Sequence, residues 1–266
     1  MIEIDSDFQK KLGNIKTFEY FMGLKGDLYR NMNGRKTLRF FIGEDGFFIK
    51  QHFGIGWKEV FKNLSQFKLP IIGARTEYNA IKHLHSLGID TMDVVGFSQK
   101  GLNPASLKSF LVTKELDQTI SLEDYCINWP QHPPTFREKK LLINKVLVAV
   151  KKMHENGMNH RDLYICHFLM RKKNKQAEDE ISLFLIDLHR SQIRKKVPER
   201  WLIKDLAALY YSAMHIGLTK RDFLRFIRDY RRLSLRDILN SEKAFWQTVE
   251  KKAYILDAMP ESKKKT

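Results

Sequence analysis

The chain has 266 residues, 43% of them hydrophobic and 12% aromatic, which excludes a disordered protein. Its formal charge of +16 favours an anionic partner: nucleic acid, a membrane surface or a phosphorylated small molecule. The alternative is a basic but inert surface. Two cysteines without CxxC spacing form no disulfide framework and suit a reducing compartment. Because there is no leader pattern and no long apolar run, we expect a cytosolic protein with at most peripheral membrane contact.

The first 116 residues alternate short apolar runs with turn signals. Asn33-Gly34 and Asp45-Gly46 are hairpin signals, and they predict an antiparallel meander that ends in the strand GFFIK, residues 46–50. A helix is predicted over residues 73–88, and strands are predicted again near residues 93–97 and 109–116.

After a short linker near residues 115–117 the pattern becomes mostly helical. The predicted elements, in order, are a long helix over 137–157, a strand within 163–170, a polar turn over 171–180, a strand over 181–187, helices from Trp201 onward, a last helix starting near Ser234, and a tail over 261–266.

This order predicts an α+β protein of two lobes. The antiparallel, β-rich N-lobe with one main helix would cover residues 1–116, and the mostly helical C-lobe residues 117–266. Ligands commonly bind in the cleft between such lobes, so we expect the functional site there.

Two charged residues conflict with the apolar pattern around them. Lys50 ends the strand over 46–50 and, taken alone, would be a solvated strand end. Glu77 shares a helical stripe with Ile81 and Leu84, at spacings i+4 and i+7. A carboxylate on a buried face needs a cation, and Lys50 is a candidate. The alternative for Glu77 is a first-turn acid favoured by the helix dipole.

Two aspartates lie next to predicted apolar strands, one just before a strand and the other at a strand end. Asp162 lies in the stretch NHRDLYICHFLM, residues 159–170, and Asp187 ends the strand over 181–187. Carboxylates at the ends of adjacent strands can converge on one site, where one accepts a proton and the other holds a metal ion. The alternative is that both only cap turns.

Together these residues follow the order of the protein-kinase-like fold: a strand Lys, a helix Glu, an HRD triplet and a strand-final Asp. In that layout Lys50 would bind the α- and β-phosphates and pair with Glu77. Asp162 would accept the proton of the attacking hydroxyl, and Asp187 would bind Mg²⁺. No GxGxxG loop and no APE motif is present, and His167 stands where HRDxxxxN places Asn. These departures favour a small-molecule or glycan kinase over a protein kinase.

Longer stretches carry a more specific resemblance, which runs from about residue 35 to the helix after Thr219. The stretches NHRDLYICHFL, GIGWKE (54–59), GARTEYNAI (73–81), IDLHR (186–190) and KDLAALYYSA (204–213) closely resemble the lipopolysaccharide core heptose(I) kinases, the WaaP/RfaP type of Gram-negative bacteria.

The resemblance implies an ATP- and Mg²⁺-dependent cytoplasmic kinase that phosphorylates heptose I of the inner core at O-4. By the same resemblance Asp162 is the catalytic base, Asp187 is a metal ligand, and Lys50 with Glu77 positions the phosphates. The family also has His at the position of His167, which would either ligate Mg²⁺ or hold an aspartate in place. Asp205 would tether the catalytic loop.

The implied acceptor is an anionic glycolipid of the inner core, with peripheral contact to the anionic inner membrane and no nucleic-acid partner. A small acidic protein such as acyl carrier protein would also suit the basic surface. One helical stripe, at spacings i, i+4, i+7 and i+11, could meet lipid head groups or be a solvated face: Arg221, Arg225, Arg228 and Arg232.

Three other functions remain open at this level. The same scaffold could act on another acceptor, namely Kdo, another sugar or a protein hydroxyl. The chain could be a non-catalytic, basic protein that binds lipid or nucleic acid. The last alternative is a transition-metal hydrolase, which would use a set without HxxxH or HExxH spacing: His160, His167, Asp187 and His189.

Overall fold

The structure is a computed structural model of the whole chain, and it describes residues 2–13, 15, 17–32, 34–65, 70–171 and 181–260, without the side chains of residues 63 and 64. The chain divides into two compact units. Unit 1 comprises Met1–His83, Thr91–Asp117 and Leu188–Arg190, and unit 2 comprises Leu84–Asp90, Gln118–Asp187 and Ser191–Thr266. The predicted lobe boundary between residues 116 and 117 stays a prediction.

Unit 1 is built on a six-stranded antiparallel sheet in the order β1-β5-β6-β4-β3-β2. Its strands are β1 (Glu3–Ile4), β2 (Asp27–Met32), β3 (Arg35–Ile42), β4 (Asp45–His52), β5 (Val94–Lys100) and β6 (Lys108–Lys114). Its helices are α1 (Ser6–Leu12), α2 (Phe18–Gly23), α3 (Gly56–Ser65) and the first part of α4 (Arg75–Ser86).

Two predictions about the meander were displaced by a few residues. The turn between β3 and β4 falls at Gly43 and Glu44 rather than at Asp45-Gly46, because Gly43 adopts the left-handed φ of 62° that this turn requires. β4 also continues to His52, so Lys50 lies inside the strand and not at its end.

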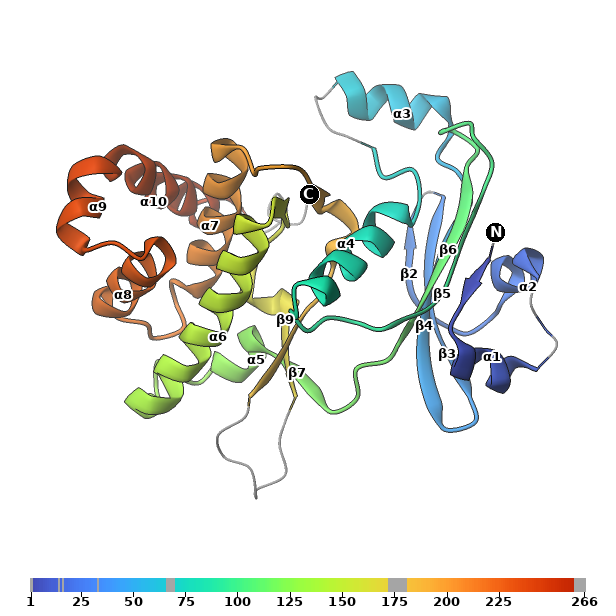
Figure 1. Cartoon of the computed structure of the whole chain (residues 1–266), viewed down its shortest axis with the longest axis horizontal. Helices are drawn as coiled ribbons and strands as arrows, with labels where there is room; N and C mark the ends of the chain where they lie inside the picture. Colours follow the sequence, from blue (N-terminus) through green and yellow to red (C-terminus); the bar gives the residue numbers. More distant parts are fainter. Residues whose placement is uncertain are drawn as a thin grey trace. The chain divides into compact units, whose positions relative to one another are not determined.

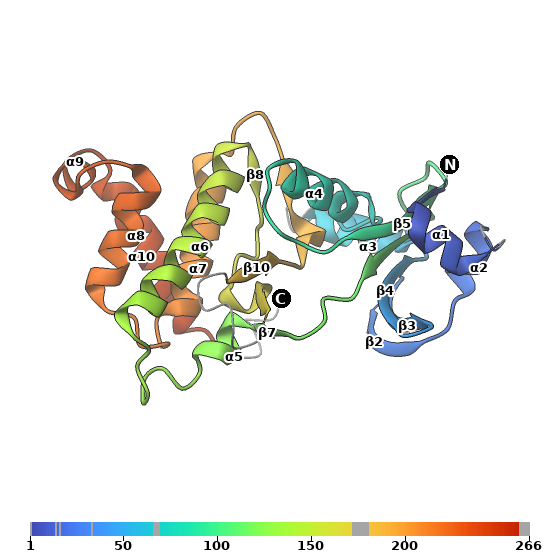
Figure 2. The same ribbon diagram turned by 60° about the horizontal axis from the view of Figure 1, so that its bottom comes forward.

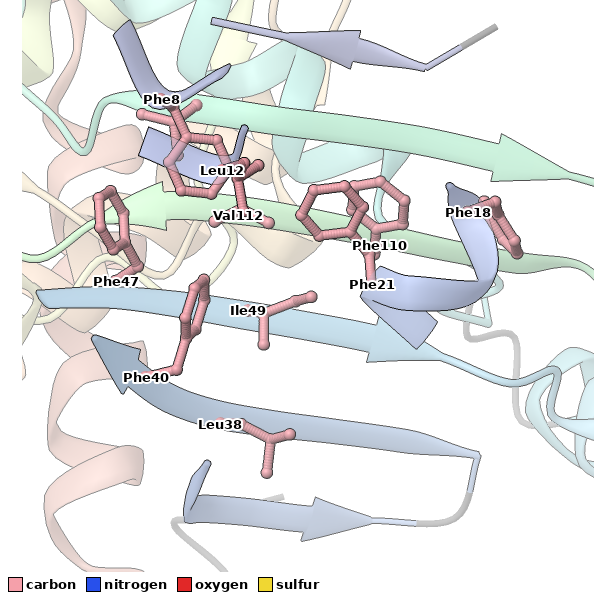
Figure 3. Close-up of a cluster of buried hydrophobic side chains, with 11 residues drawn as sticks. Phe8, Leu12, Phe18, Phe21, Leu38, Phe40, Phe47, Ile49, Phe110 and Val112 are labelled. Carbon is pink, nitrogen blue, oxygen red and sulfur yellow. The ribbon is translucent and has the colours of Figure 1, made fainter. Parts of the chain in front are cut away.

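Helices α1 and α2 cover one face of the sheet with aromatic side chains (Figure 3). Strand side chains point alternately to the two faces, so every second residue of β3, β4 and β6 meets these helices. The resulting cluster is almost entirely shielded from solvent and consists of Phe8, Leu12, Phe18, Phe21, Leu38, Phe40, Phe47, Ile49, Val95, Phe110 and Val112.

The same alternation turns Lys50 to the opposite face of the sheet. That face carries the first part of α4, where the Tyr78 ring stacks on Phe97 with centroids 4.2 Å apart. In Figure 1, α1 and α2 lie on one side of the sheet and α4 on the other. The fold therefore presents Lys50 of β4 to α4.

Unit 2 is mostly helical (Figures 1 and 2). α7 packs against α10, and α6 packs against α8. Among the described residues, no helix combines the length and the apolar character needed to cross a bilayer. The helices are α5 (Leu122–Cys126), α6 (Phe136–Glu155), α7 (Glu199–Ala213), α8 (Lys220–Arg231), α9 (Leu235–Ser241) and α10 (Lys243–Asp257).

Short strands and one 3₁₀ turn, η1, lie among the loops of unit 2. One sheet has the order β10-β9-β7 and the other pairs β11 with β8. These elements are β7 (Thr119–Ser121), β8 (Met158–Asn159), η1 (Ile165–His167), β9 (Phe168–Arg171), β10 (Ser182–Leu185) and β11 (Gln192–Ile193), while η2 (Leu188–Arg190) belongs to unit 1.

The predicted strand within 163–170 begins only at Phe168, because η1 forms a tight turn first. The Ser212 hydroxyl accepts a hydrogen bond from Ile165 N (3.0 Å) and holds this turn against α7. The strand predicted over 181–187 ends at Leu185, two residues before Asp187. Most of the predicted turn over 171–180 and the tail over 261–266 lie outside the described residues.

Gly157 ends α6 and allows the next loop to form. Its φ is 78°, and the carbonyl oxygen of Arg194 lies where a Cβ would stand. Its own carbonyl accepts a hydrogen bond from Arg194 N (2.9 Å), which fixes the start of the HRD segment beside β11. A residue with a side chain would disrupt this junction.

Candidate functional site

In unit 1 the structure brings Lys50 and Glu77 together. The Lys50 ammonium lies 2.6 Å from Glu77 Oε1, with 24% of the Lys50 side chain and 2% of the Glu77 side chain exposed. A buried carboxylate is costly without a partner, so this ion pair explains how Glu77 is tolerated on the inner face of α4. The side of the pair that remains open is the cationic side.

His52 lies two residues beyond Lys50 on the same face of β4. Burial, together with the nearby charges of Arg35 and Lys50, lowers the pKa of His52 to about 3. The imidazole is therefore neutral at physiological pH and adds no charge beside Lys50.

In unit 2, Asp205 of α7 fixes the backbone of the HRD segment. Its carboxylate is completely buried and accepts hydrogen bonds from His160 N (2.6 Å) and Arg161 N (2.7 Å). Hydrogen bonds from backbone N–H groups to a carboxylate are strong. This anchoring agrees with the tethering role that was predicted for Asp205, and it sets the position of the next residue, Asp162.

A second set of buried groups holds Asp205 from behind. His154 Nε2 lies 3.2 Å from Asp205 Oδ2 and His154 Nδ1 lies 2.8 Å from the Tyr230 hydroxyl. A carboxylate can only accept, so Nε2 carries the proton and Nδ1 accepts from Tyr230. Burial raises the pKa of Tyr230, which keeps it a donor. No local sequence pattern indicated these two residues, because α6, α7 and α8 bring them together with Asp205 from distant positions.

The backbone of unit 2 is strained next to Asp162 and at Asp187. Arg161 and Asp187 adopt φ values of 77° and 61°, in the left-handed region that residues with side chains rarely occupy. Such strain persists where the surroundings impose it, and it occurs often at functional sites. Here Asp205 imposes it on Arg161, and it sets the direction of Asp162.

His167 lies between the predicted base, Asp162, and the predicted metal ligand, Asp187. Its Nδ1 lies 2.7 Å from the carbonyl oxygen of Asp162, and its Nε2 lies 3.5 Å from Asp187 Oδ2. Because a carbonyl can only accept, Nδ1 must be the protonated nitrogen. A neutral His167 therefore presents an unshared electron pair to the Asp187 carboxylate, an arrangement that a cation between them would stabilise.

His160 packs under His167 with ring centroids 5.7 Å apart. Its Nε2 lies 2.9 Å from the Ile186 carbonyl oxygen and must donate to it. Burial lowers the pKa of His160, so the ring stays neutral. It connects the HRD segment to the residue before Asp187 and so couples the positions of both aspartates.

Lys204 is a further residue of the site that the sequence analysis missed. Its ammonium lies 3.9 Å from Asp162 Oδ1. The only available signal was its position next to Asp205, directly before the apolar run over residues 206–209. The Trp201 ring, one turn earlier on α7, lies near three cations, with Arg161 at 4.8 Å, Arg200 at 5.3 Å and Lys204 at 5.8 Å. Lys204 thus places positive charge beside the carboxylate of Asp162.

The donor chemistry of the site suits Mg²⁺ in part. Among the described residues, no group of three or more His, Cys, Asp or Glu is arranged to hold a metal ion by itself. Mg²⁺ usually takes one or two carboxylates and completes its shell with water and substrate phosphate. Asp187 offers such a carboxylate, whereas the His167 nitrogen is a less preferred ligand.

The arginine stripe on α8 is partly neutralised by acids on the same helix. Arg225 lies 3.3 Å from Asp222 and Arg228 lies 2.7 Å from Asp229. A role for this stripe in lipid binding stays a prediction.

Comparison with known proteins identifies the family. Residues 19–230 match the model of the lipopolysaccharide kinase (Kdo/WaaP) family. The chain belongs to this family. The predicted resemblance and the predicted enzyme class, a phosphotransferase, are thereby confirmed.

Relatives of this Kdo/WaaP-family kinase match it over nearly their whole length. The lipopolysaccharide core heptose(I) kinase WaaP of Escherichia coli is 44% identical over 253 residues, covering 95% of this chain and 96% of the relative. WaaP of Pseudomonas aeruginosa is 45% identical over 250 residues, covering 94% and 93%. A solved structure of WaaP in complex with acyl carrier protein superposes with a TM-score of 0.82 at 40% identity, covering 96% and 98%. The predicted α+β, protein-kinase-like fold is confirmed.

Proposed function

We propose that this chain is an ATP-dependent kinase that phosphorylates heptose I of the lipopolysaccharide inner core at O-4. The observation that carries the proposal is the match, over at least 93% of both chains, to two proteins named heptose(I) kinase. The same chain keeps the Lys50–Glu77 pair and the HRD segment held by Asp205.

We assign the binding of the nucleotide phosphates to Lys50. The ion pair with Glu77 fixes the direction of the Lys50 side chain, whose ammonium is partly exposed and can bind phosphate oxygens. Glu77 acts through Lys50 and is a positioning residue. Because His52 is neutral, Lys50 supplies the positive charge for phosphate binding on this face of β4.

We assign the role of base to Asp162. Its carboxylate would accept the proton of the heptose hydroxyl as that oxygen forms a bond to the γ-phosphorus and the bond to the β–γ bridging oxygen breaks, releasing ADP. Phosphoryl transfer depends on positioning and charge neutralisation more than on covalent chemistry. The strained, anchored backbone of Arg161 supplies that positioning.

Asp187 would hold Mg²⁺, which supplies charge neutralisation on the β- and γ-phosphate oxygens when bound. His167 has two possible roles, as a ligand through Nε2 or as a support for Asp187. Nδ1 donates to the Asp162 carbonyl, so Nε2 is the nitrogen that faces Asp187 and is placed for either role.

Lys204 would orient Asp162 and add positive charge beside the transferred phosphoryl group. Its 3.9 Å approach to Asp162 supports this role, as do the other cations around Trp201. Charge placed in advance where negative charge develops lowers the barrier to transfer. The same cations would suit an acceptor that carries acidic groups.

The proposed setting is the cytoplasmic face of the inner membrane, where a lipid-anchored core would be the acceptor. A solved WaaP is bound to acyl carrier protein, and a small acidic partner of that kind suits the +16 charge of this chain. We therefore include acyl carrier protein among the proposed partners.

Transfer of labelled phosphate from ATP tests the proposal. The purified chain is supplied with Mg²⁺ and, in separate reactions, heptose-containing core glycolipid, a Kdo-terminated glycolipid without heptose, and a mixture of peptides. We expect label only in the heptose-containing acceptor, at O-4 when mapped by NMR. Transfer to the Kdo glycolipid or to peptides alone would assign the scaffold to another acceptor, and no Mg²⁺-dependent ATP binding would point to a non-catalytic protein.

A further inference from the structure

One end of unit 1 exposes aromatic and cationic side chains together. We define the α3 surface as the exposed apolar residues Phe53, Trp57, Phe61 and Leu102, with the exposed lysines Lys36, Lys58 and Lys62. Trp57 is 50% exposed, Phe61 62% and Leu102 99%. Exposed large apolar residues that stand singly need no explanation, but a group of them marks an interaction site.

Three backbone segments join to form this surface. Gly34, in the β2–β3 turn, accepts a hydrogen bond from Phe53 N (2.8 Å), and Gly56 N donates to the Ala105 carbonyl (2.9 Å) in the β5–β6 connection that carries Leu102. Figure 1 shows α3 beside the end of the β5–β6 hairpin. The surface is therefore a built feature of unit 1.

The helix itself has the side-chain arrangement of an interfacial helix. Trp57 and Phe61, at i and i+4, stack with centroids 5.6 Å apart. Lys58 and Lys62 form the neighbouring stripe, and Val60 points into unit 1, where it is buried. Lys62 lies 3.4 Å from Glu59, the one acid among the described residues of α3, and Lys36 lies 5.7 Å from the Phe53 ring. Aromatic rings flanked by lysines are typical of helices that lie in the head-group region of a bilayer.

We infer that the α3 surface docks this protein on an anionic phospholipid bilayer. The inference rests on the proposed function, because a kinase of a lipid-anchored acceptor must work at a membrane. The lysines complement anionic head groups, and Trp57 and Phe61 enter the boundary between head groups and acyl chains.

Vesicle flotation tests the inference on the full-length chain. Vesicles of phosphatidylcholine alone are compared with vesicles that also contain phosphatidylglycerol, at low and high salt. The variants are Trp57→Ser/Phe61→Ser, Lys58→Ser, and Phe41→Ser as the matched control. Phe41 is also 50% exposed, but it lies at the opposite end of β3 from the α3 surface.

The wild type should bind the anionic vesicles, and this binding should weaken as the salt concentration rises. Loss of both aromatic side chains should lower partitioning about 10- to 100-fold, and loss of one lysine should lower it about fivefold. Phe41→Ser should bind as the wild type does. Failure of the wild type to bind anionic vesicles would overturn the inference, as would equal binding by the double variant.

Fluorescence gives a second reading that does not depend on a folded double variant. Vesicles with brominated acyl chains should quench the wild type more than Trp57→Phe, because Trp57 is the tryptophan of the α3 surface and would lie at the acyl boundary. Equal quenching of the two proteins would contradict docking through α3. If the wild type were a dimer and the double variant a monomer, the α3 surface would bind a second copy of the chain and the inference would be wrong.

A lipid-free core oligosaccharide separates this inference from the proposed function. The wild type and the double variant should phosphorylate it equally, because the α3 surface acts on membrane binding only. Vesicle binding without any transfer to heptose would leave docking intact and refute the kinase proposal. Transfer to heptose without vesicle binding would refute docking and leave the kinase proposal intact.

Discussion

The two groups of candidate functional residues, one in each unit, are held in different ways. In unit 1, Glu77 is matched by the ammonium of Lys50, at the end of a long side chain that is still partly exposed. In unit 2, Asp205 is completely buried and accepts hydrogen bonds from two consecutive backbone N–H groups. His154 lies between Asp205 and the Tyr230 hydroxyl. One arrangement fixes a side chain and the other fixes a stretch of backbone.

This difference fits two different chemical tasks. A phosphate-binding cation can adjust to its ligand, since Coulombic attraction falls slowly with distance. A base must be placed within hydrogen-bond distance of one hydroxyl, and small displacements are costly. The protein therefore positions Asp162 with a strained backbone and a buried hydrogen-bond network, and it positions Lys50 with a single ion pair.

The largest expected effect comes from breaking the network of unit 2. Asp205→Ala leaves the N–H groups of His160 and Arg161 without an acceptor, so the free energy of unfolding should fall by about 3–5 kcal/mol and transfer should be lost. Thermal and chemical denaturation measure the change. Asp229→Ala is the control, because its ion pair with Arg228 is exposed and should contribute little to stability. Equal effects of the two substitutions would remove Asp205 from its anchoring role.

Opening the ion pair of unit 1 should act on nucleotide use and not on folding of unit 2. Lys50→Ala should lower kcat/KM for ATP about 100-fold. Glu77→Gln should lower it less, because it loosens the ammonium without removing it. Steady-state kinetics with varied ATP measures both. A Glu77→Gln variant as inactive as Lys50→Ala would show that the carboxylate itself takes part in the reaction.

Substitution of Lys204 tests whether the proposed base, Asp162, depends on a charge beside it. Lys204→Met should lower kcat about tenfold while KM for ATP stays the same, because the ammonium would act on the transferred group. Lys204→Arg should restore part of the loss. An unchanged kcat, or a loss that follows only a lower melting temperature, would make Lys204 structural.

The smallest effect is a pH dependence of stability that both units share. The pKa values of His52 and His160 are lowered in the folded protein, to about 3 for His52. Below the ordinary histidine pKa the unfolded chain binds more protons than the folded one, so stability falls as the pH falls. Each group contributes at most about 1.4 kcal/mol per pH unit.

Denaturation between pH 7 and pH 5 checks this sign. His52→Gln should flatten the pH dependence, because it removes one of the two buried rings whose pKa is lowered. Stability that rises as the pH falls would contradict the neutral, buried state of both rings.

Local patterns were sufficient to predict much of the site. The i, i+4, i+7 stripe of α4 indicated that Glu77 faces inward, and it lies against Lys50. The HRD segment and Asp187 stood out because charge interrupted apolar runs. Those signals are local, since they depend on the period of a helix or a strand.

The rest depends on distant parts of the chain meeting in space. His154, Asp205 and Tyr230 lie on three different helices, and Lys204 reaches Asp162 across 42 residues of sequence. The helices α1, α2 and α3 were also not predicted; all three are short, and α3 begins among glycines that favour a loop interpretation. No periodic pattern records such contacts.

The most direct test of the account compares ATP·Mg²⁺ binding and phosphate transfer in one variant, Asp162→Ala. Calorimetry gives the nucleotide affinity, and single-turnover transfer to the heptose-containing core gives the chemical rate. We expect an affinity close to that of the wild type and a rate lower by about 1,000-fold or more. Substantial transfer, or loss of ATP binding together with transfer, would contradict the assignment of Asp162 as the base.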